Sequence, residues 1–215
     1  KNPSTRNTII NEMKSILKRD KLKDYSFAVV ANFAPDSTYN GKSISEINLM
    51  LGRKKNITNE ANLILDMLEK SNAQMIYHTM SENDLVHFMK YPFNMPAADA
   101  GISNGSGMPH PRGYGTNARV LAKYVREEKI IRLEEALRRM TSLPATKFNL
   151  RDRGMLMPGK FADIVIFDEN LIQDLSVYDQ PHQFSKGIYY VLVNGKLVIE
   201  NEKHNGNKTG VALRN

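Results

Sequence analysis

The sequence FNMPAADAGISNGSGMPHPRGYGT, residues 93–116, is the most informative stretch of the chain, because a short apolar run ends there at Asp99 and a glycine-rich loop follows. Residues 93–98 have the length and composition of a short β-strand. Five of the chain's 13 glycines lie between Asp99 and Thr116. A loop of this length without elements of its own is usually functional or disordered. The stretch therefore predicts a strand that leads into a candidate functional loop.

Helix and strand patterns alternate upstream of this stretch. Helices are expected where apolar residues recur at helical spacing behind a starting residue, namely after Ser4, Ser43, Thr58 and Ser81. Ser43 and Glu46 also have the spacing of a capping box. Strands are expected at residues 25–30 and 73–77. This order predicts parallel β-α units and places the chain in the α/β class.

Two further helices are expected after the loop, at residues 118–128 and 133–140. The apolar period then changes from that of a helix to that of a strand. We therefore place a boundary near Leu150, which separates an α/β part, residues 1–150, from a β part, residues 151–215.

The β part begins with a run that predicts a buried strand at residues 162–168. Residues 189–200 then form two alternating runs around Asn194-Gly195. Asn-Gly supplies the two positive φ angles of a type I′ turn, so this segment predicts a β-hairpin. Residues 203–215 are rich in Gly, Asn and Lys and are expected to be a loosely held tail.

The composition is that of an ordinary soluble globular chain, with 41% apolar and 25% charged residues among 215. No apolar run approaches the roughly 18 residues of a membrane span, and no signal peptide is visible, so we expect a cytoplasmic protein without a membrane partner. Cysteine is absent, which excludes disulfides and a cysteine nucleophile. The net charge is +7, but the basic residues form no single stripe, so we expect no nucleic-acid partner.

Asp99 is the first candidate for chemistry. In parallel α/β folds the catalytic side chains lie at the C-terminal ends of strands, which is where Asp99 is predicted. A carboxylate there can act as a general base or bind a metal ion. The alternative is a loop aspartate that only caps a turn.

The motif Pro109-His110-Pro111-Arg112 is the second candidate. The two prolines stiffen the backbone on both sides of His110, and the planar guanidinium of Arg112 suits a carboxylate or a phosphate. The alternative is a proline-rich turn with a solvated arginine. The histidines show no HxH or HExxH spacing, and the glycines match neither the dinucleotide nor the P-loop pattern.

Residues 91–201 resemble the D-aminoacylases, the N-acyl-D-amino-acid deacylases of the amidohydrolase superfamily. The resemblance is carried by an ordered set of motifs: Ala98-Asp99-Ala100, Pro109-His-Pro-Arg-Gly-Tyr-Gly-Thr116, Tyr124-Val-Arg-Glu-Glu128, Leu133-Glu-Glu-Ala136, Met140-Thr-Ser-Leu-Pro-Ala145, Arg153-Gly154 and Gly159-Lys-Phe-Ala-Asp-Ile-Val165. The family commonly has Ser-Asp-Gly around its aspartate, where this chain has alanine on both sides of Asp99.

The resemblance implies an architecture, an activity and a cofactor. The family has a (β/α)8 metal-dependent-hydrolase barrel and a small β-sandwich domain built from both chain ends. Residues 1–150 would then be the C-terminal units of the barrel, and residues 151–215 would be C-terminal strands of the sandwich and the tail. The implied activity is zinc-dependent hydrolysis of an N-acyl-D-amino acid, a small-molecule substrate, to a D-amino acid and a carboxylate.

The resemblance also implies roles for three residues. Asp99 matches the family aspartate that takes the proton of the attacking water and returns it to the leaving amine, and it is a candidate metal ligand. Arg112 matches the arginine that binds the substrate α-carboxylate. His110 matches the histidine beside it and is assigned to the substrate pocket or its support.

The metal histidines of the family lie upstream of the matched region. We therefore expect this chain to be a fragment that is inactive alone and self-associates through open strand edges. One alternative is another amidohydrolase, a cyclic amidase of the dihydroorotase kind. A second alternative, favoured by the basic charge and the absent metal motif, is a non-catalytic anion-binding or interaction module.

Overall fold

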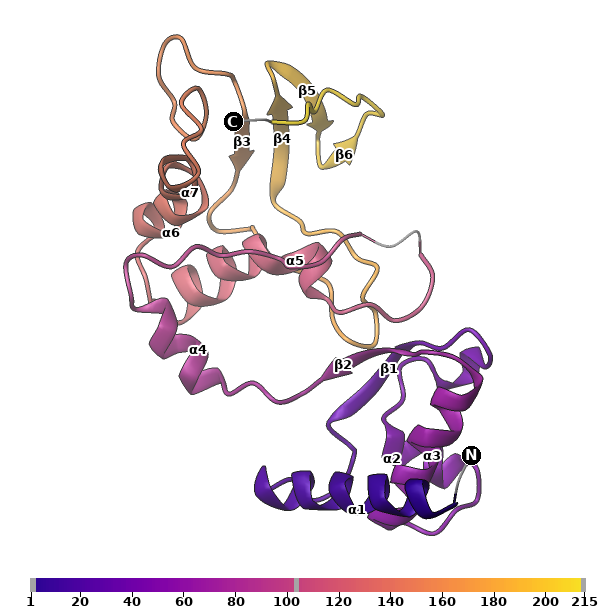
Figure 1. The fold of residues 1–215 in the computed structure, drawn as a ribbon. Helices are drawn as coiled ribbons and strands as arrows, with labels where there is room; N and C mark the ends of the chain where they lie inside the picture. The colour runs from indigo at the N-terminus through magenta and orange to yellow at the C-terminus, as the bar shows by residue number, and fades with distance from the viewer. Residues whose placement is uncertain (1–2, 103–104, 214–215) are drawn as a thin grey trace. The chain divides into compact units, whose positions relative to one another are not determined.

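The computed structural model describes residues 3–102 and 105–213, whose elements divide between two compact units (Figure 1). Unit 1 consists of Lys1–Thr79, Ser103–His110 and Tyr178–Pro181. Unit 2 consists of Met80–Ile102, Pro111–Val177 and His182–Asn215. These units do not coincide with the boundary expected near Leu150, which separates an α/β part from a β part and stays a prediction.

Unit 1 places three helices and a short 3₁₀ helix around two strands. Its elements in chain order are α1 (Pro3–Arg19), β1 (Ala28–Asn32), η1 (Ser37–Tyr39), α2 (Ile44–Met50), α3 (Ile57–Lys70) and β2 (Gln74–Tyr77). The predicted helices after Ser4, Ser43 and Thr58 are confirmed. So are both predicted strands, although β1 begins three residues later than expected.

The two strands pair antiparallel, with Ala28 opposite Tyr77, so the prediction of parallel β-α units is wrong for this pair. The reason lies in the connection. A single crossover helix returns the chain for a parallel strand, whereas the two helices α2 and α3 between these strands reverse its direction once more.

The predicted capping box is present at the start of α2. The Ser43 side chain accepts from the Glu46 backbone N–H at 3.2 Å, and a Glu46 carboxylate oxygen accepts from the Ser43 backbone N–H at 2.7 Å. Each bond satisfies a backbone donor that the helix itself leaves unpaired.

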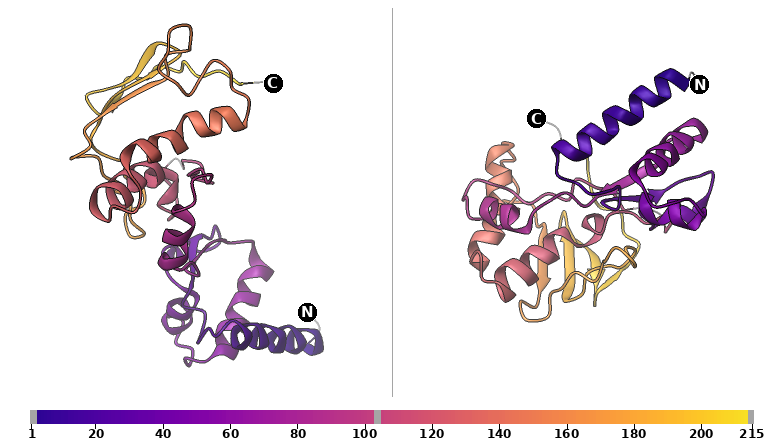
Figure 2. Two further views of the ribbon diagram at one scale, coloured as in Figure 1. Left: turned by 90° about the vertical axis from the view of Figure 1, so that its left-hand side faces the viewer. Right: turned by 90° about the horizontal axis from the view of Figure 1, so that it is seen from below.

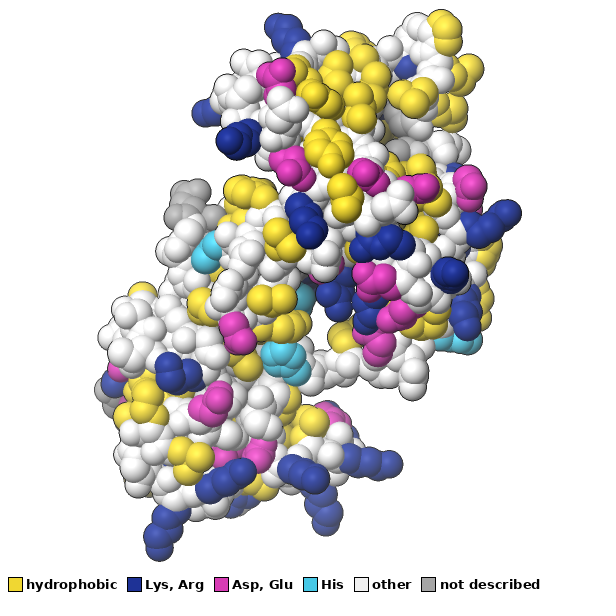
Figure 3. All heavy atoms as spheres, turned by 180° about the vertical axis from the view of Figure 1, so that it is seen from behind, with side chains coloured by type: hydrophobic (Ala, Val, Ile, Leu, Met, Phe, Trp, Pro, Cys, Tyr) yellow, Lys and Arg dark blue, Asp and Glu magenta, His cyan; other side chains and the backbone are white. Residues whose placement is uncertain are grey.

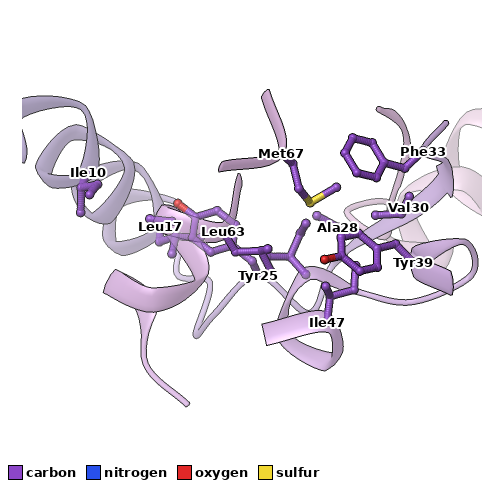
Figure 4. Close-up of a cluster of buried hydrophobic side chains, with 12 residues drawn as sticks. Ile10, Leu17, Tyr25, Ala28, Val30, Phe33, Tyr39, Ile47, Leu63 and Met67 are labelled. Carbon is purple, nitrogen blue, oxygen red and sulfur yellow. The ribbon is translucent and has the colours of Figure 1, made fainter. Parts of the chain in front are cut away.

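The core of unit 1 is closed by its own elements. Leu17 of α1, Val30 of β1, Ile47 of α2 and Leu63 of α3 are each 2% exposed or less, and Figure 4 shows their side chains gathered in one cluster. Burial of such a side chain contributes roughly 1.5–3 kcal/mol, so the apolar contacts among the helices and β1 hold this unit together.

Unit 2 combines helices with a four-stranded sheet, seen from two further directions in Figure 2. Its helices are α4 (Glu82–Met89), α5 (Arg112–Arg119), η2 (Val120–Glu127), α6 (Leu133–Met140) and α7 (Ser142–Lys147). Its strands are β3 (Ile164–Phe167), β4 (Ile188–Val193), β5 (Lys196–Glu200) and β6 (Lys203–His204). The stretch η2, which continues α5 directly, is π-helical, and the Glu128 N–H bonds the Lys123 carbonyl five residues earlier at 2.8 Å.

The sheet has the strand order β3-β4-β5-β6, and all its pairs are antiparallel. The hairpin predicted at Asn194-Gly195 is confirmed, with φ angles of 52° and 75°. The tail is held more firmly than expected, because β6 pairs with β5 and the Thr209 hydroxyl donates to the Val193 carbonyl at 3.0 Å.

Three expectations for unit 2 are wrong. Residues 93–98 form no strand, and Pro96 within them lacks the N–H that a ladder needs. Residues 112–116 are helical and begin α5, so the loop is shorter than predicted. β3 is not buried, since the side chains of Val165 and Ile166 are 53% and 49% exposed; β3 lies at the edge of the sheet.

The core of unit 2 joins the helices to the chain around β3. Leu121 and Tyr124 of η2, Ala136 of α6 and Ile172 belong to one buried cluster, against which Phe167 packs. Within the described residues, no helix is both long enough and apolar enough to cross a membrane.

Candidate functional site

Asp99 lies where the apolar run meets the loop. Its φ angle is 45°, in the left-handed region that residues with a side chain seldom adopt. Aspartate is among the residues that tolerate this conformation best, because its side chain is short and polar. The carboxylate is 89% exposed, so solvent and a ligand can both reach it.

Arg112, the first residue of α5, binds Asp99. Its Nη2 atom donates to the Asp99 backbone carbonyl at 3.0 Å and lies 3.3 Å from the Asp99 carboxylate oxygen Oδ2. Sequence reasoning predicted both residues as site members but not this contact. Because both side chains are largely exposed, the ion pair is worth at most about 1 kcal/mol and can be exchanged for another carboxylate.

A close backbone contact fixes the Asp99 segment against the start of α5. A Cβ atom placed on Gly113 would lie 2.8 Å from the Gly101 carbonyl oxygen. No side chain fits at that distance, so glycine is required at 113. The glycine thus lets the chain just after Asp99 approach the first turn of α5, where Arg112 stands.

Helix α5 is itself attached to the chain that follows β3. Arg119 pairs with Asp174 at 3.0 Å, and a Cβ on Gly115 would lie 2.8 Å from the Asp174 Cβ. Farther along, the Tyr114 hydroxyl and His182 Nδ1 are 3.0 Å apart. The two hydrogen-bonded pairs lie 55 and 68 positions apart in the chain, so no local pattern in the sequence predicts Asp174 or His182 as supports of the site.

His110, the third predicted site residue, belongs to unit 1 and has partners there. Its Nε2 atom lies 3.2 Å from the Tyr178 hydroxyl, and the two rings pack edge to face. His78 packs on the same tyrosine, with ring centroids 4.6 Å apart. Within unit 2 the structure brings Asp99 and Arg112 together. Within unit 1 it places His110 in an aromatic cluster, His78-Tyr178-His110, that sequence reasoning did not find.

The described residues do not make a metal site. Across residues 3–102 and 105–213, no group of three or more His, Asp or Glu side chains has the arrangement to hold a metal ion. A zinc ion needs three or four fixed protein ligands, and Asp99 supplies at most one. The side chains of this chain therefore do not fit zinc by themselves.

Charged side chains are mixed over the surface. Figure 3 shows lysine and arginine side chains scattered over one face, with acidic side chains among them. Several basic residues are engaged in ion pairs, for example Arg6 with Asp66 and Lys123 with Glu82. No continuous basic groove is visible on this face, so the +7 charge does not single out a binding surface.

Residues 102–199 match the Amidohydrolase family, and comparison with known sequences also finds individual relatives. The N-acyl-D-glutamate deacylase of Alcaligenes xylosoxydans xylosoxydans is 43% identical over 57% of this chain and 25% of its own length. The N-acyl-D-aspartate deacylase of the same organism is 32% identical over 92% of this chain and 37% of its own. A dihydroorotase of Lactobacillus acidophilus is 34% identical over 36% of this chain and 21% of its own.

Solved structures agree with these relatives. The crystal structure of a D-aminoacylase superposes with a TM-score of 0.76 at 30% identity, over 85% of this chain and 36% of that one. The N-acyl-D-glutamate deacylase of Bordetella bronchiseptica, in complex with zinc and a phosphonate inhibitor, gives 0.71 at 34% identity, over 84% and 36%. The chain thus spans well under half the length of the proteins it matches. By sequence and fold, it belongs to the D-aminoacylase amidohydrolases.

Proposed function

We propose that the protein containing this chain hydrolyses N-acyl-D-amino acids to a D-amino acid and a carboxylate. The observation that carries the proposal is the pairing of Asp99, an exposed carboxylate in a constrained loop, with Arg112 at the start of α5. One group can move a proton and the other can bind an acidic substrate, and both are held in one small region of unit 2.

The roles follow from the chemistry of the two side chains. The guanidinium of Arg112 binds the α-carboxylate of the substrate and orients the amide. That carboxylate competes with Asp99 for Arg112, so substrate binding frees the Asp99 carboxylate. Asp99 then accepts the proton of the attacking water and returns it to the leaving amine. His110 belongs to the substrate pocket or its support, held by Tyr178.

We assign the chain to the C-terminal part of the enzyme: residues 1–150 to the last units of a (β/α)8 barrel, and residues 151–215 to strands of a small β-sandwich. The exposed apolar side chains of β3 support the second assignment, because a sandwich sheet is covered by a partner sheet. Because β1 and β2 pair antiparallel, we assign them to a local addition to the barrel part and not to the parallel strands of the barrel itself.

Zinc is the proposed cofactor of the whole enzyme, in agreement with the zinc-bound deacylase structure. Since the described residues do not form a zinc site, the other ligands must come from a different part of the protein. No role of the residues in this chain is derived through the metal.

Hydrolysis by the full-length enzyme tests the proposal. N-acetyl-D-amino acids, their L-enantiomers and a cyclic amide such as dihydroorotate are offered as substrates, with and without a chelator. Chelator-sensitive hydrolysis of the D-compounds alone supports the proposal. Activity on the cyclic amide alone would favour the dihydroorotase-like alternative, to which the shorter match with a dihydroorotase points. No hydrolysis at all favours a non-catalytic module.

The Asp99→Asn variant tests the role of the carboxylate. Asparagine has nearly the same shape and cannot accept a proton, so kcat should fall by about 10²–10⁴-fold while the fold is kept. Asp152→Asn, the same change at another exposed aspartate, is the matched control and should leave kcat unchanged. Near-normal kcat for Asp99→Asn would make Asp99 a structural turn residue.

A further inference from the structure

Unit 1 contains an open cavity of about 430 Å³ that shares no residue with the Asp99 and Arg112 site. It is lined by residues from the loop before β1, from β1, from the start of α2 and from the loop after it. Its volume falls within the range of about 300–1,000 Å³ that is typical of small-molecule sites. The lining therefore indicates which ligand the cavity can take.

Two carboxylates line this cavity, those of Asp24 and Glu46. The pKa of Asp24 lies below its ordinary value because Ser26 donates hydrogen bonds to it from its side chain and its backbone. The pKa of Glu46 is lowered in the same way by the backbone and side chain of Ser43. Both groups are therefore negatively charged at neutral pH and favour a cationic ligand group.

One cation, Lys55, stands beside these carboxylates. Its Nζ atom lies 3.8 Å from the Asp24 oxygen Oδ2, and its side chain is 64% exposed. An ammonium group so placed is free to turn and is only partly neutralised by Asp24. The lining thus presents two negative groups and one positive group to the same space, and a ligand that carries both charges complements them.

Small and apolar residues complete the lining. Ser45, which is 6% exposed, adds a small side chain to it. Val29 and Leu49 add apolar surface, which accommodates an alkyl side chain.

We propose that this cavity binds a free α-amino acid as its zwitterion, with the ammonium group toward Asp24 and Glu46 and the carboxylate toward Lys55. The identification as a product site rests on the proposed function. In the substrate the amine is acylated and uncharged, and hydrolysis releases it as an ammonium ion. The two carboxylates therefore separate product from substrate by charge, and the site senses the product.

His78 connects the cavity to a predicted site residue within unit 1. This residue lines the cavity, and its ring packs on Tyr178, whose hydroxyl lies 3.2 Å from His110 Nε2. A ligand in the cavity meets one end of the His78-Tyr178-His110 cluster. We therefore expect the NMR signals of both histidines to move when the cavity is filled.

Calorimetric titration of the 215-residue chain tests the proposal without any catalysis. D-alanine, D-leucine and D-glutamate are compared with ethylamine, which lacks the carboxylate, and with N-acetyl-D-alanine, which lacks the ammonium charge. We expect at least one free amino acid to bind at least tenfold more tightly than both reduced probes, since each lost charged contact is worth about that factor. Equal binding of N-acetyl-D-alanine, equal binding of ethylamine, or no binding of any amino acid overturns the proposal.

Two variants locate the binding. Lys55→Gln and Asp24→Asn should each weaken it about tenfold, and asparagine at 24 keeps an acceptor for the Ser26 N–H. Lys54→Gln, the same change at an exposed neighbour that does not line the cavity, is the control and should bind normally. Unchanged amino-acid affinity in both the Lys55 and the Asp24 variants contradicts the proposed site. Loss of hydrolysis in the full-length enzyme with normal binding here would contradict only the proposed function.

Discussion

Unit 1 buries its first strand, β1, among its own helices, whereas unit 2 leaves the first strand of its sheet open. In unit 1, Val30 of β1 is fully buried and Phe33 just beyond it is 1% exposed. In unit 2, Val165 and Ile166 of β3 are about half exposed, and consecutive residues of a strand face opposite sides of the sheet. Both faces of β3 therefore present apolar surface to solvent.

The different exposure of β1 and β3 indicates that the two units are stabilised in different ways. Unit 1 has a closed apolar core, so its stability is set by contacts within the unit. Unit 2 has its own core among η2, α6 and the chain around β3, and it adds a partly buried ion pair between Arg139 and Glu135. Its sheet still has uncovered apolar surface, which is usual where another segment or another molecule packs.

The largest expected effect compares one phenylalanine from each unit. Phe33 is buried and stacks on Tyr39, so Phe33→Ala should lower the free energy of unfolding by about 3–5 kcal/mol. Phe161 in unit 2 is 53% exposed under the Arg153 guanidinium, and Phe161→Ala should cost only about 0.5–1 kcal/mol. Urea denaturation of both variants measures the two losses. Equal losses would show that the two phenylalanines contribute alike and that burial does not distinguish them.

A second test concerns the ionic contacts of unit 2. Hydrogen bonds from two arginines lower the pKa of Glu135 from 4.5 to about 2, and the bond from Arg138 has a larger effect than the bond from Arg139. The native carboxylate therefore holds its charge to lower pH than in the unfolded chain. Its stabilising contribution is complete above about pH 4.5 and is lost as the pH falls from there toward 2.

Urea denaturation at pH 7, 5 and 3 measures this contribution. Glu135→Gln should reduce the loss of stability between pH 5 and pH 3 relative to the parent chain. Glu134→Gln, one residue away and exposed, is the matched control and should keep the parent's pH dependence. If both variants lose the same free energy of unfolding between pH 5 and pH 3, the two arginines do not make the ionisation of Glu135 stabilise the fold.

The smallest effect on stability is expected at β3. Val165→Thr with Ile166→Thr keeps β-branched side chains and makes the exposed surface more polar, so the free energy of unfolding should change by less than about 0.5 kcal/mol. Self-association, measured by light scattering across concentration, should decrease. Val211→Thr, an exposed valine outside the sheet, is the control. Unchanged self-association in the double variant would show that β3 is not the surface through which copies of the chain associate.

Local signals in the sequence predicted local structure well. The Ser43-Glu46 pair sets the start of α2, and Asn194-Gly195 sets the turn of the hairpin, because in each case the residues that act are neighbours. Helix α6 was likewise predicted with the bounds that it has, since its apolar residues recur along one short segment.

Features that depend on distant partners could not be read from the sequence. The direction of β2 relative to β1 depends on how two intervening helices pack, and residues 93–98 have the composition of a strand but no strand pairs with them in the described chain. The same holds at the site. Asp99 and Arg112 stood out by position and motif, while Tyr178 supports His110 from 68 residues away.

The π-helical stretch η2 has a consequence for how this chain is compared and edited. A π-helix closes its bonds over five residues where an α-helix uses four, so it accommodates one residue more for the same number of bonds. An alignment with a relative whose helix is regular should therefore show a one-residue gap between Val120 and Glu127. Deleting one residue there should convert the stretch to a regular helix and leave the chain after it close to its present position, because the π-helical stretch already absorbs the extra residue.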